Sequence, residues 1–193
     1  MIKVGIIGYG KMGRIRGRAV EESGKGKVVS IYDPMAVDVP SGAQLAPSPE
    51  AIIADPAVGA VCICTPNYLN EPLTIMALEA GKHVFCEKPP AFTAAGVENV
   101  RRAEEHSGKA LMYGFNHRHH ESIQRMKRIV DSGEMGRILW MRGRYGKEVD
   151  EGFLKGWRAE KELAGGGIML DQGIHMLDLF LHLGGGFDEV QAM

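Results

Sequence analysis

The first part of the chain alternates short apolar runs with segments whose apolar residues recur at helical spacing. The apolar runs predict five strands, at residues 2–7, 27–32, 58–64, 83–86 and 110–115. Between them, helix signals include Ser48 and Thr93 as N-caps, Pro49 at a first helical position and Gly81 as a terminator. Strands that alternate with helices indicate crossover connections, and therefore an α/β fold with a doubly wound parallel sheet.

The pattern changes near residue 116. The later elements expected are a helix at 121–131, a strand at 138–145, a loop at 147–163, an apolar helix at 167–183 and the start of a strand at 188–193. This mixture predicts a second unit of α/β or α+β type. We therefore divide the chain into domains at residues 1–116 and 117–193.

Composition narrows the function classes. The 193 residues are 45% hydrophobic and 24% charged, with a net charge of −1, as in an ordinary globular protein. The balanced charge argues against nucleic acid as a partner. No apolar run reaches the length of a membrane span, and no secretory signal precedes the first strand. We expect a cytoplasmic protein.

Three cysteines agree with a reducing compartment. Cys62 and Cys64 lie within one apolar run and Cys86 closes another. A metal site would need a second pair of ligands nearby, and the sequence offers none. We therefore expect small buried side chains and no metal.

A glycine-rich segment follows the first predicted strand and precedes the first helix. Its residues are Gly8, Tyr9, Gly10, Lys11, Met12 and Gly13. In this context Gly8 permits a tight turn, Gly10 lets the backbone approach a pyrophosphate, and Gly13 allows helix and strand to pack closely. The helix N-terminus adds N–H donors for the anion. The segment predicts a dinucleotide site of the Rossmann type.

An acidic residue closes the second predicted strand. Asp33 lies twenty residues after Gly13, where a carboxylate can accept the ribose hydroxyls of a dinucleotide. The same charge would repel the 2′-phosphate of NADP. NAD is therefore the expected cofactor, and NADP is disfavoured.

Polar tripeptides end the third and fourth strands. Thr65, Pro66 and Asn67 follow one strand, and Glu87 and Lys88 follow the other. Simple turn chemistry accounts for polar residues at either place. Because the carboxyl ends of parallel strands meet at one edge of a sheet, we expect these residues to extend the cofactor site.

The late apolar helix carries four ionisable residues on one stripe. Asp171, His175, Asp178 and His182 are spaced by four, three and four residues, and apolar side chains occupy most of the remaining circumference. Ionisable groups on a helix buried nearly all round must find partners or line a cavity.

Three interpretations of this stripe compete. A metal site is the least favoured, because no further ligands stand out. A buried polar network suits Asp178 and His182. An acid/base pair, with His175 moving a proton and Asp171 orienting the imidazole, is the sharper hypothesis. The sequence pattern alone does not choose between the last two for Asp171 and His175.

The motifs together resemble the Gfo/Idh/MocA oxidoreductases, named for glucose–fructose oxidoreductase and inositol dehydrogenase. The resemblance covers essentially the whole chain. It rests on the glycine segment, Thr65-Pro66-Asn67, Glu87-Lys88-Pro89, Asn116 with Arg118, and Gly166-Gly167 followed by Asp171-Gln172-Gly173-Ile174-His175. The Glu-Lys-Pro and Asp-x-Gly-x-His elements in combination are specific, whereas the glycine motif alone would not be.

The resemblance implies a Rossmann domain followed by an α/β domain with a large open sheet, here incomplete. It implies hydride transfer between nicotinamide and a secondary alcohol or ketone of a sugar or cyclitol. By this analogy Lys88 binds near the nicotinamide and the substrate hydroxyl, His175 accepts the proton, and Asp171 positions His175 or substrate. The Lys88–Pro89 bond is a candidate for the cis form.

Two departures from the family pattern stand out. Asn70 replaces a histidine of many relatives, and we attach little functional weight to it. Family chains are also considerably longer, so strands of the second domain would be missing and exposed edges would favour a homo-oligomer. An NAD-binding sensor or regulatory protein without turnover is therefore the alternative function.

Two further segments are open to more than one interpretation. His117, His119 and His120 surround Arg118 and suggest a metal site, but a solvated segment is favoured. The Trp157-Arg158 pair is equally compatible with sugar contact and with anchoring of the loop.

Overall fold

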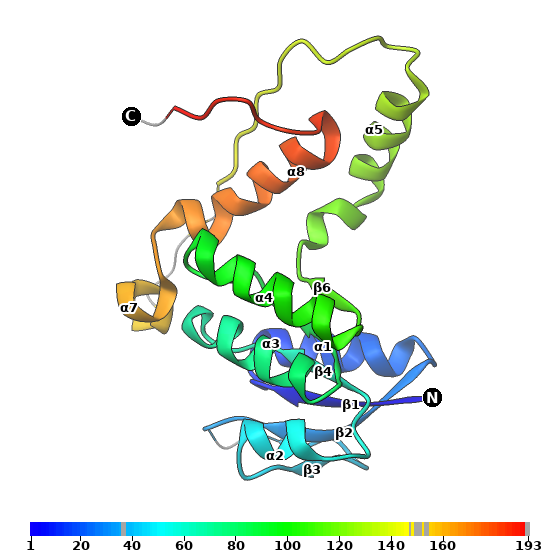
Figure 1. Cartoon of the computed structure of the whole chain (residues 1–193), viewed down its shortest axis with the longest axis vertical. Coiled ribbons are helices and arrows are strands. Elements are labelled where there is room, and N and C mark those ends of the chain that lie inside the picture. The colour runs from blue at the N-terminus through cyan, green and yellow to red at the C-terminus, as the bar shows by residue number, and fades with distance from the viewer. Residues whose placement is uncertain (36–37, 147, 149–151, 153–154, 192–193) are drawn as a thin grey trace.

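The computed structural model describes residues 1–35, 38–146, 148, 152 and 155–191. A sheet with helices forms one end of the molecule, and α5 and α8 extend from it at the other end (Figure 1). The chain between α5 and α8 loops over the top of these two helices before it returns toward the sheet unit.

The sheet has six strands in the order β3-β2-β1-β4-β5-β6, and every pairing is parallel. The strands are β1 Ile2–Ile7, β2 Gly26–Tyr32, β3 Gln44–Leu45, β4 Ala60–Ile63, β5 His83–Cys86 and β6 Leu111–Tyr113. Five of these strands were expected, and the two-residue β3 was too short to leave a hydrophobic pattern. The strand order reverses at β1, which is the topological switch point of a doubly wound sheet.

The carboxyl ends of the strands lie in one row. Ile7 of β1 pairs in register with Tyr32 of β2 and with Ile63 of β4. Ile63 in turn pairs with Cys86 of β5, which pairs with Tyr113 of β6. The segments that follow these residues therefore meet along one edge of the sheet.

The helices follow the predicted crossover pattern. Their bounds are α1 Lys11–Glu22, α2 Pro49–Ala54, α3 Asn70–Glu79, α4 Ala94–Ser107, α5 Glu121–Ser132, α7 Lys161–Ala164 and α8 Ile174–Gly184. Both expected N-caps form, since the hydroxyl of Ser48 accepts the Ala51 N–H at 3.2 Å and that of Thr93 accepts the Gly96 N–H at 3.0 Å.

Two buried clusters lie on the two faces of the sheet. One includes Ile7 and Ile63 and packs under α2 and α3, and the other includes Ile6 and Ile31. Successive residues of a strand point to opposite faces, so neighbours such as Ile6 and Ile7 serve different clusters. This arrangement is the expected α/β Rossmann-like fold.

The expected strand at 138–145 is wrong. These residues are irregular, and Leu139 and Trp140 are 78% and 76% exposed. A strand needs a neighbour for its backbone hydrogen bonds, and no described segment pairs with this one. For the same reason residues 188–191 form no strand; residues 192–193 lie outside the described part of the chain.

Two other later elements differ in detail from expectation. The polar stretch at 147–163 was expected to be a loop, but its described residues include a 3₁₀ turn, Trp157–Ala159, and the start of α7. A four-residue helix is too short to show a period. The apolar helix begins with a π-helical turn, Met169–Gly173, before α8.

The Lys88–Pro89 bond agrees with expectation, as do Cys62 and Cys86, which are buried, whereas Cys64 is only partly buried. All three cysteines are free, and the bond is cis. Burial raises the pKa of the Cys62 thiol to about 11 and that of Cys86 to about 12. None of the described helices has the length and apolar character needed to cross a membrane.

The glycine turn between β1 and α1 needs glycine at two positions and leaves a third open. Gly8 has φ +85°, and a Cβ there would lie 2.5 Å from the Cys64 carbonyl oxygen. A Cβ at Gly13 would lie 2.1 Å from the Gly8 carbonyl oxygen. A Cβ at Gly10 would meet nothing within 4 Å.

Gly13→Ala therefore has to push α1 away from the turn. We expect a loss of about 2 kcal/mol in the free energy of unfolding, measured by urea denaturation, because backbone atoms cannot give way as a flexible side chain does. Gly10→Ala is the matched control and keeps wild-type stability. Equal stability of both variants would contradict this packing.

Candidate functional site

Asp33 lies beside the glycine turn, directly after β2. Its carboxylate accepts the backbone N–H of Tyr9 at 2.6 Å and that of Met35 at 2.9 Å. These contacts hold a negative charge next to the first β–α turn. The distance from Gly13 in sequence predicted this position, but not the two backbone donors.

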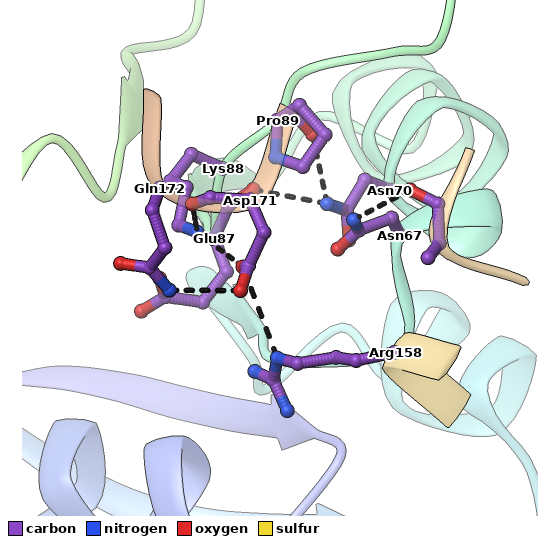
Figure 2. Close-up of polar contacts among 9 residues, drawn as sticks. Asn67, Asn70, Glu87, Lys88, Pro89, Arg158, Asp171 and Gln172 are labelled. Carbon is purple, nitrogen blue, oxygen red and sulfur yellow. Dashed lines mark hydrogen bonds and ion pairs between the residues drawn. The ribbon is translucent and has the colours of Figure 1, made fainter. Parts of the chain in front are cut away.

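Lys88 and Asp171 form the central contact of the site, between the loop after β5 and the π-helical turn before α8. The Lys88 ammonium donates to Asp171 Oδ1 at 2.9 Å and also to the Asp171 carbonyl (Figure 2). Their side chains are only 13% and 14% exposed. A charge pair with so little solvent is held far more firmly than one on the surface.

Asp171 has further donors around it. The Gln172 amide lies 2.8 Å from Oδ2, and Arg158 Nε lies 3.8 Å from Oδ1 (Figure 2). Burial alone would raise the pKa of the Asp171 carboxyl, but Lys88, Gln172 and Arg158 outweigh burial and lower it. Asp171 is therefore a carboxylate at neutral pH.

Asn70 holds the loop that carries Lys88. Its side chain is fully buried, and its amide donates to the Glu87 carbonyl at 3.1 Å and to the Pro89 carbonyl at 2.8 Å (Figure 2). This position therefore matters more for structure than the sequence indicated. Asn67 ties the same edge to the later part of the chain, because its amide donates to the Ala164 carbonyl at 2.9 Å.

Glu87 has a partner within the protein. Its Oε1 accepts from Arg16 Nε at 2.8 Å and lies 2.7 Å from Arg16 Nη2. A Cβ at Gly114 would lie 2.6 Å from Glu87 Oε2, so the glycine after β6 leaves room for the carboxylate. Glu87 thus joins α1 to the loop of Lys88 at the side of the cavity.

His175 occupies the first turn of α8 and is 6% exposed. Burial first, then the neighbouring imidazole of His117 and the Lys88 ammonium, lowers the pKa of His175 to about 4. The carboxylates of Asp178 and Asp171 act in the opposite direction and do not overcome this. The imidazole is therefore neutral at physiological pH and can accept a proton.

The four ionisable residues on the stripe of the late helix do not share one site. Asp171 and His175 line one cavity, whereas Asp178 binds the Arg118 guanidinium through both carboxylate oxygens. His182 lines a separate hollow of about 700 Å³ between β6, α5 and α8. This larger hollow contains none of the expected site residues.

A cavity of about 360 Å³ at the carboxyl edge of the sheet collects most of the expected residues. Those that line it are Gly10, Lys11, Met12, Thr65, Asn67, Glu87, Lys88, Asp171 and His175. Five other residues that were expected in the cofactor site do not line this cavity: Gly8, Tyr9, Gly13, Asp33 and Pro66. These five belong to the glycine turn and to the segments that follow β2 and β4.

The cavity also contains residues that were not expected in the site. They are Cys64, Asn116, His117, Tyr145, Trp157, Arg158 and Gln172. The Trp157-Arg158 pair was open between two interpretations, and the histidine segment was expected to be solvated. Tyr145 gave no sequence signal, and Gln172 was noted only as a member of the Asp171–His175 motif, because their place depends on how the irregular segment and the π-helical turn meet. Within the described residues, no three His, Cys, Asp or Glu side chains are grouped to hold a metal.

Comparison with known proteins identifies the family of the chain. Residues 2–115 match the model described as oxidoreductase family, NAD-binding Rossmann fold, and residues 123–193 match the GFO/IDH/MocA C-terminal domain. The chain belongs to the GFO/IDH/MocA oxidoreductase family. The resemblance inferred from its motifs is thereby confirmed.

Several relatives of this family member are dehydrogenases. Levoglucosan dehydrogenase of Pseudarthrobacter phenanthrenivorans is 36% identical over 145 residues, which are 74% of this chain and 37% of the relative. The scyllo-inositol 2-dehydrogenase (NADP(+)) of Bacillus subtilis is 31% identical over 188 residues, 95% of this chain and 52% of the relative. A solved levoglucosan dehydrogenase with NADH and levoglucosan has a TM-score of 0.87 at 30% identity, covering 96% of this chain and 55% of that one.

The chain spans about half the length, or less, of these relatives. The two family models together cover the glycine turn, Lys88, Asp171 and His175. The domain boundary near residue 116 stays a prediction.

Replacing Asn70 tests whether this buried amide holds the Lys88 loop. Asn70→Ala leaves the Pro89 carbonyl without this donor and the Glu87 carbonyl with the Cys86 thiol alone, and we expect the free energy of unfolding to fall by about 3 kcal/mol. Asn99→Ala is the control, because Asn99 is exposed and donates at 3.3 Å to Glu71 in an exposed contact. A loss at Asn70 no larger than that at Asn99 would contradict the assignment.

Proposed function

We propose that this chain carries the coenzyme-binding and catalytic residues of an NAD-dependent dehydrogenase. Its substrate is a secondary alcohol or ketone of a sugar, a sugar derivative or a cyclitol. The observation that carries the proposal is one cavity in which the N-terminal end of α1, the Lys88–Asp171 pair and the neutral His175 lie together.

The glycine turn fits a dinucleotide. The open space at Gly10 lets a pyrophosphate approach the backbone, and the N–H groups at the start of α1 point toward the same cavity. Asp33 supplies acceptors for ribose hydroxyls beside this turn. When bound, NAD supplies the acceptor for the hydride of the alcohol.

Lys88 holds the substrate oxygen. Two of its three N–H donors contact Asp171, and a third remains for a hydroxyl or carbonyl in the cavity. An ammonium at that oxygen stabilises the negative charge that develops as the hydroxyl proton leaves. Asp171 keeps the ammonium in place.

His175 takes the proton of the carbinol hydroxyl during oxidation and returns it during reduction. A base must be unprotonated before it can act, and the burial of His175 ensures this at neutral pH. Trp157 and Arg158 also line the cavity, and an aromatic face with a guanidinium suits a polyhydroxylated ring.

The proposal includes a cytoplasmic homo-oligomer. Three free cysteines suit a reducing compartment. Exposed Leu139 and Trp140 supply apolar surface for association. Light scattering from the purified gene product measures the assembly, and a monomer at micromolar concentration would contradict this part of the proposal.

Removing the proposed base or cation tests the mechanism. In the product of the complete gene, His175→Ala and Lys88→Ala should each lower kcat for oxidation of a sugar or cyclitol by about 10²- to 10⁴-fold. His182→Ala, on the same helix but outside the cavity, keeps wild-type turnover. Full turnover by either active-site variant would overturn the mechanism. NAD binding without turnover of any sugar or cyclitol would favour the sensor function instead.

Asp33→Asn tests the choice of coenzyme. The variant removes the charge and keeps an amide oxygen for the Tyr9 or Met35 N–H. We expect the ratio of NADP to NAD dissociation constants to fall by about tenfold, a change of about 1.4 kcal/mol. Titration calorimetry with both coenzymes measures this ratio. An unchanged ratio would remove Asp33 as the residue that selects NAD over NADP.

A further inference from the structure

Three histidine rings lie in a row from the buried site to the surface. The ring centroid of His117 is 4.2 Å from that of His175, with the rings at 79°. On its other side His117 stacks on His120, with centroids 5.4 Å apart and an angle of 22°. Tyr145 contacts the pair, stacked on His175 at 6.3 Å and edge-on to His117 at 5.5 Å.

Exposure rises along this series. His175 is 6% exposed, His117 is half-buried and His120 is exposed. His117 lines the same cavity as His175, whereas His120 does not. A proton taken up by His175 lies in a buried site, and these two rings lead from there to solvent.

The electrostatics favour onward transfer. Burial, then His120 and Lys88, lowers the pKa of His117, while Asp178 opposes this. Protonated His175 gives up its proton more readily than an ordinary histidine, because burial first, and then His117 and Lys88, lower its pKa. Asp171 and Asp178 face it along its own helix, with Asp178 already bound to Arg118. A positive charge at His175 is therefore not retained.

The ring nitrogens have the capacity to pass a proton. Among the described residues, Nδ1 of His117 and Nδ1 of His175 are both buried and without a hydrogen-bond partner. The rings touch, so a ring rotation or one bridging water connects them. Structural histidines in a core usually have both nitrogens satisfied.

We propose that His117 and His120 form a relay that carries the substrate proton from His175 to solvent. The inference rests on the proposed dehydrogenase function. The carbinol O–H bond breaks as an N–H bond forms on His175, and the hydride leaves the same carbon for the nicotinamide coenzyme. His175 then passes its proton to His117, His117 passes one to His120, and His120 releases one to water.

The test replaces His117 by a ring without nitrogens. His117→Phe in the product of the complete gene keeps the aromatic contact with His175 and Tyr145. We expect kcat for alcohol oxidation to fall by about tenfold, with little change in KM, and added imidazole to restore it. His119→Phe is the matched control, since His119 lies in the same 3₁₀ turn, Asn116–His119, but outside the cavity. This variant should keep the wild-type kcat, and added imidazole should not change it. Wild-type kcat in His117→Phe, or a loss that imidazole does not restore, overturns the relay and leaves the dehydrogenase proposal intact.

A second measurement does not depend on turnover. NMR titration of the histidine rings in coenzyme-free protein follows His175 directly. Because His117 lowers the pKa of His175, His117→Phe should raise it, whereas His119→Phe should not. An unchanged His175 pKa in a folded His117→Phe variant would show that the rings do not interact.

His120→Phe separates the outer step from the inner one. The side chain is exposed, so the substitution does not disturb the core. We expect a smaller loss of kcat than in His117→Phe, again restored by imidazole. If His120→Phe keeps the wild-type kcat at low buffer concentration, His120 is not part of the relay.

Discussion

The ion pair between Lys88 and Asp171 is the contact on which the site depends. It joins residues 83 positions apart, one on the loop after β5 and the other in the π-helical turn before α8. Every supporting interaction serves one of these two ends. Asn70 holds the loop through two carbonyls, and Gln172 and Arg158 hold the carboxylate. Without this pair, the Lys88 ammonium would lose its carboxylate in a buried place, and Asp171 would be left with the Gln172 amide and the longer contact with Arg158.

The same pair separates the protonation states of neighbouring groups. Its carboxylate stays charged because three donors outweigh burial, while its ammonium is one of the charges that keep His175 neutral. A cation, an anion and a neutral base therefore coexist in one small cavity at neutral pH. Hydride transfer from an alcohol needs this combination, because the oxygen must be stabilised as its proton departs.

The sequence predicted the nucleotide-binding unit well, because its signals are local. Glycines at a strand–helix junction, N-caps such as Ser48 and apolar strands each act within a few residues. The strand at 138–145 failed, because strand formation depends on a partner elsewhere. The ring cluster around His117 was missed for a related reason: it forms only where the 3₁₀ turn Asn116–His119, the irregular segment at 138–145 and α8 meet. Spacing alone placed four ionisable residues on one stripe of the helix. It did not indicate that Asp178 would bind Arg118 or that His182 would line a separate hollow.

The pH dependence of kcat/KM for alcohol oxidation shows directly whether the neutral His175 is the base, since this quantity reports the essential base of the free protein. We expect kcat/KM to stay constant as the pH falls from neutrality and to decline only as the pH approaches the His175 pKa of about 4. His175 would lose its proton-accepting form only there. A decline centred near the ordinary histidine value of about 6.5 would contradict the account.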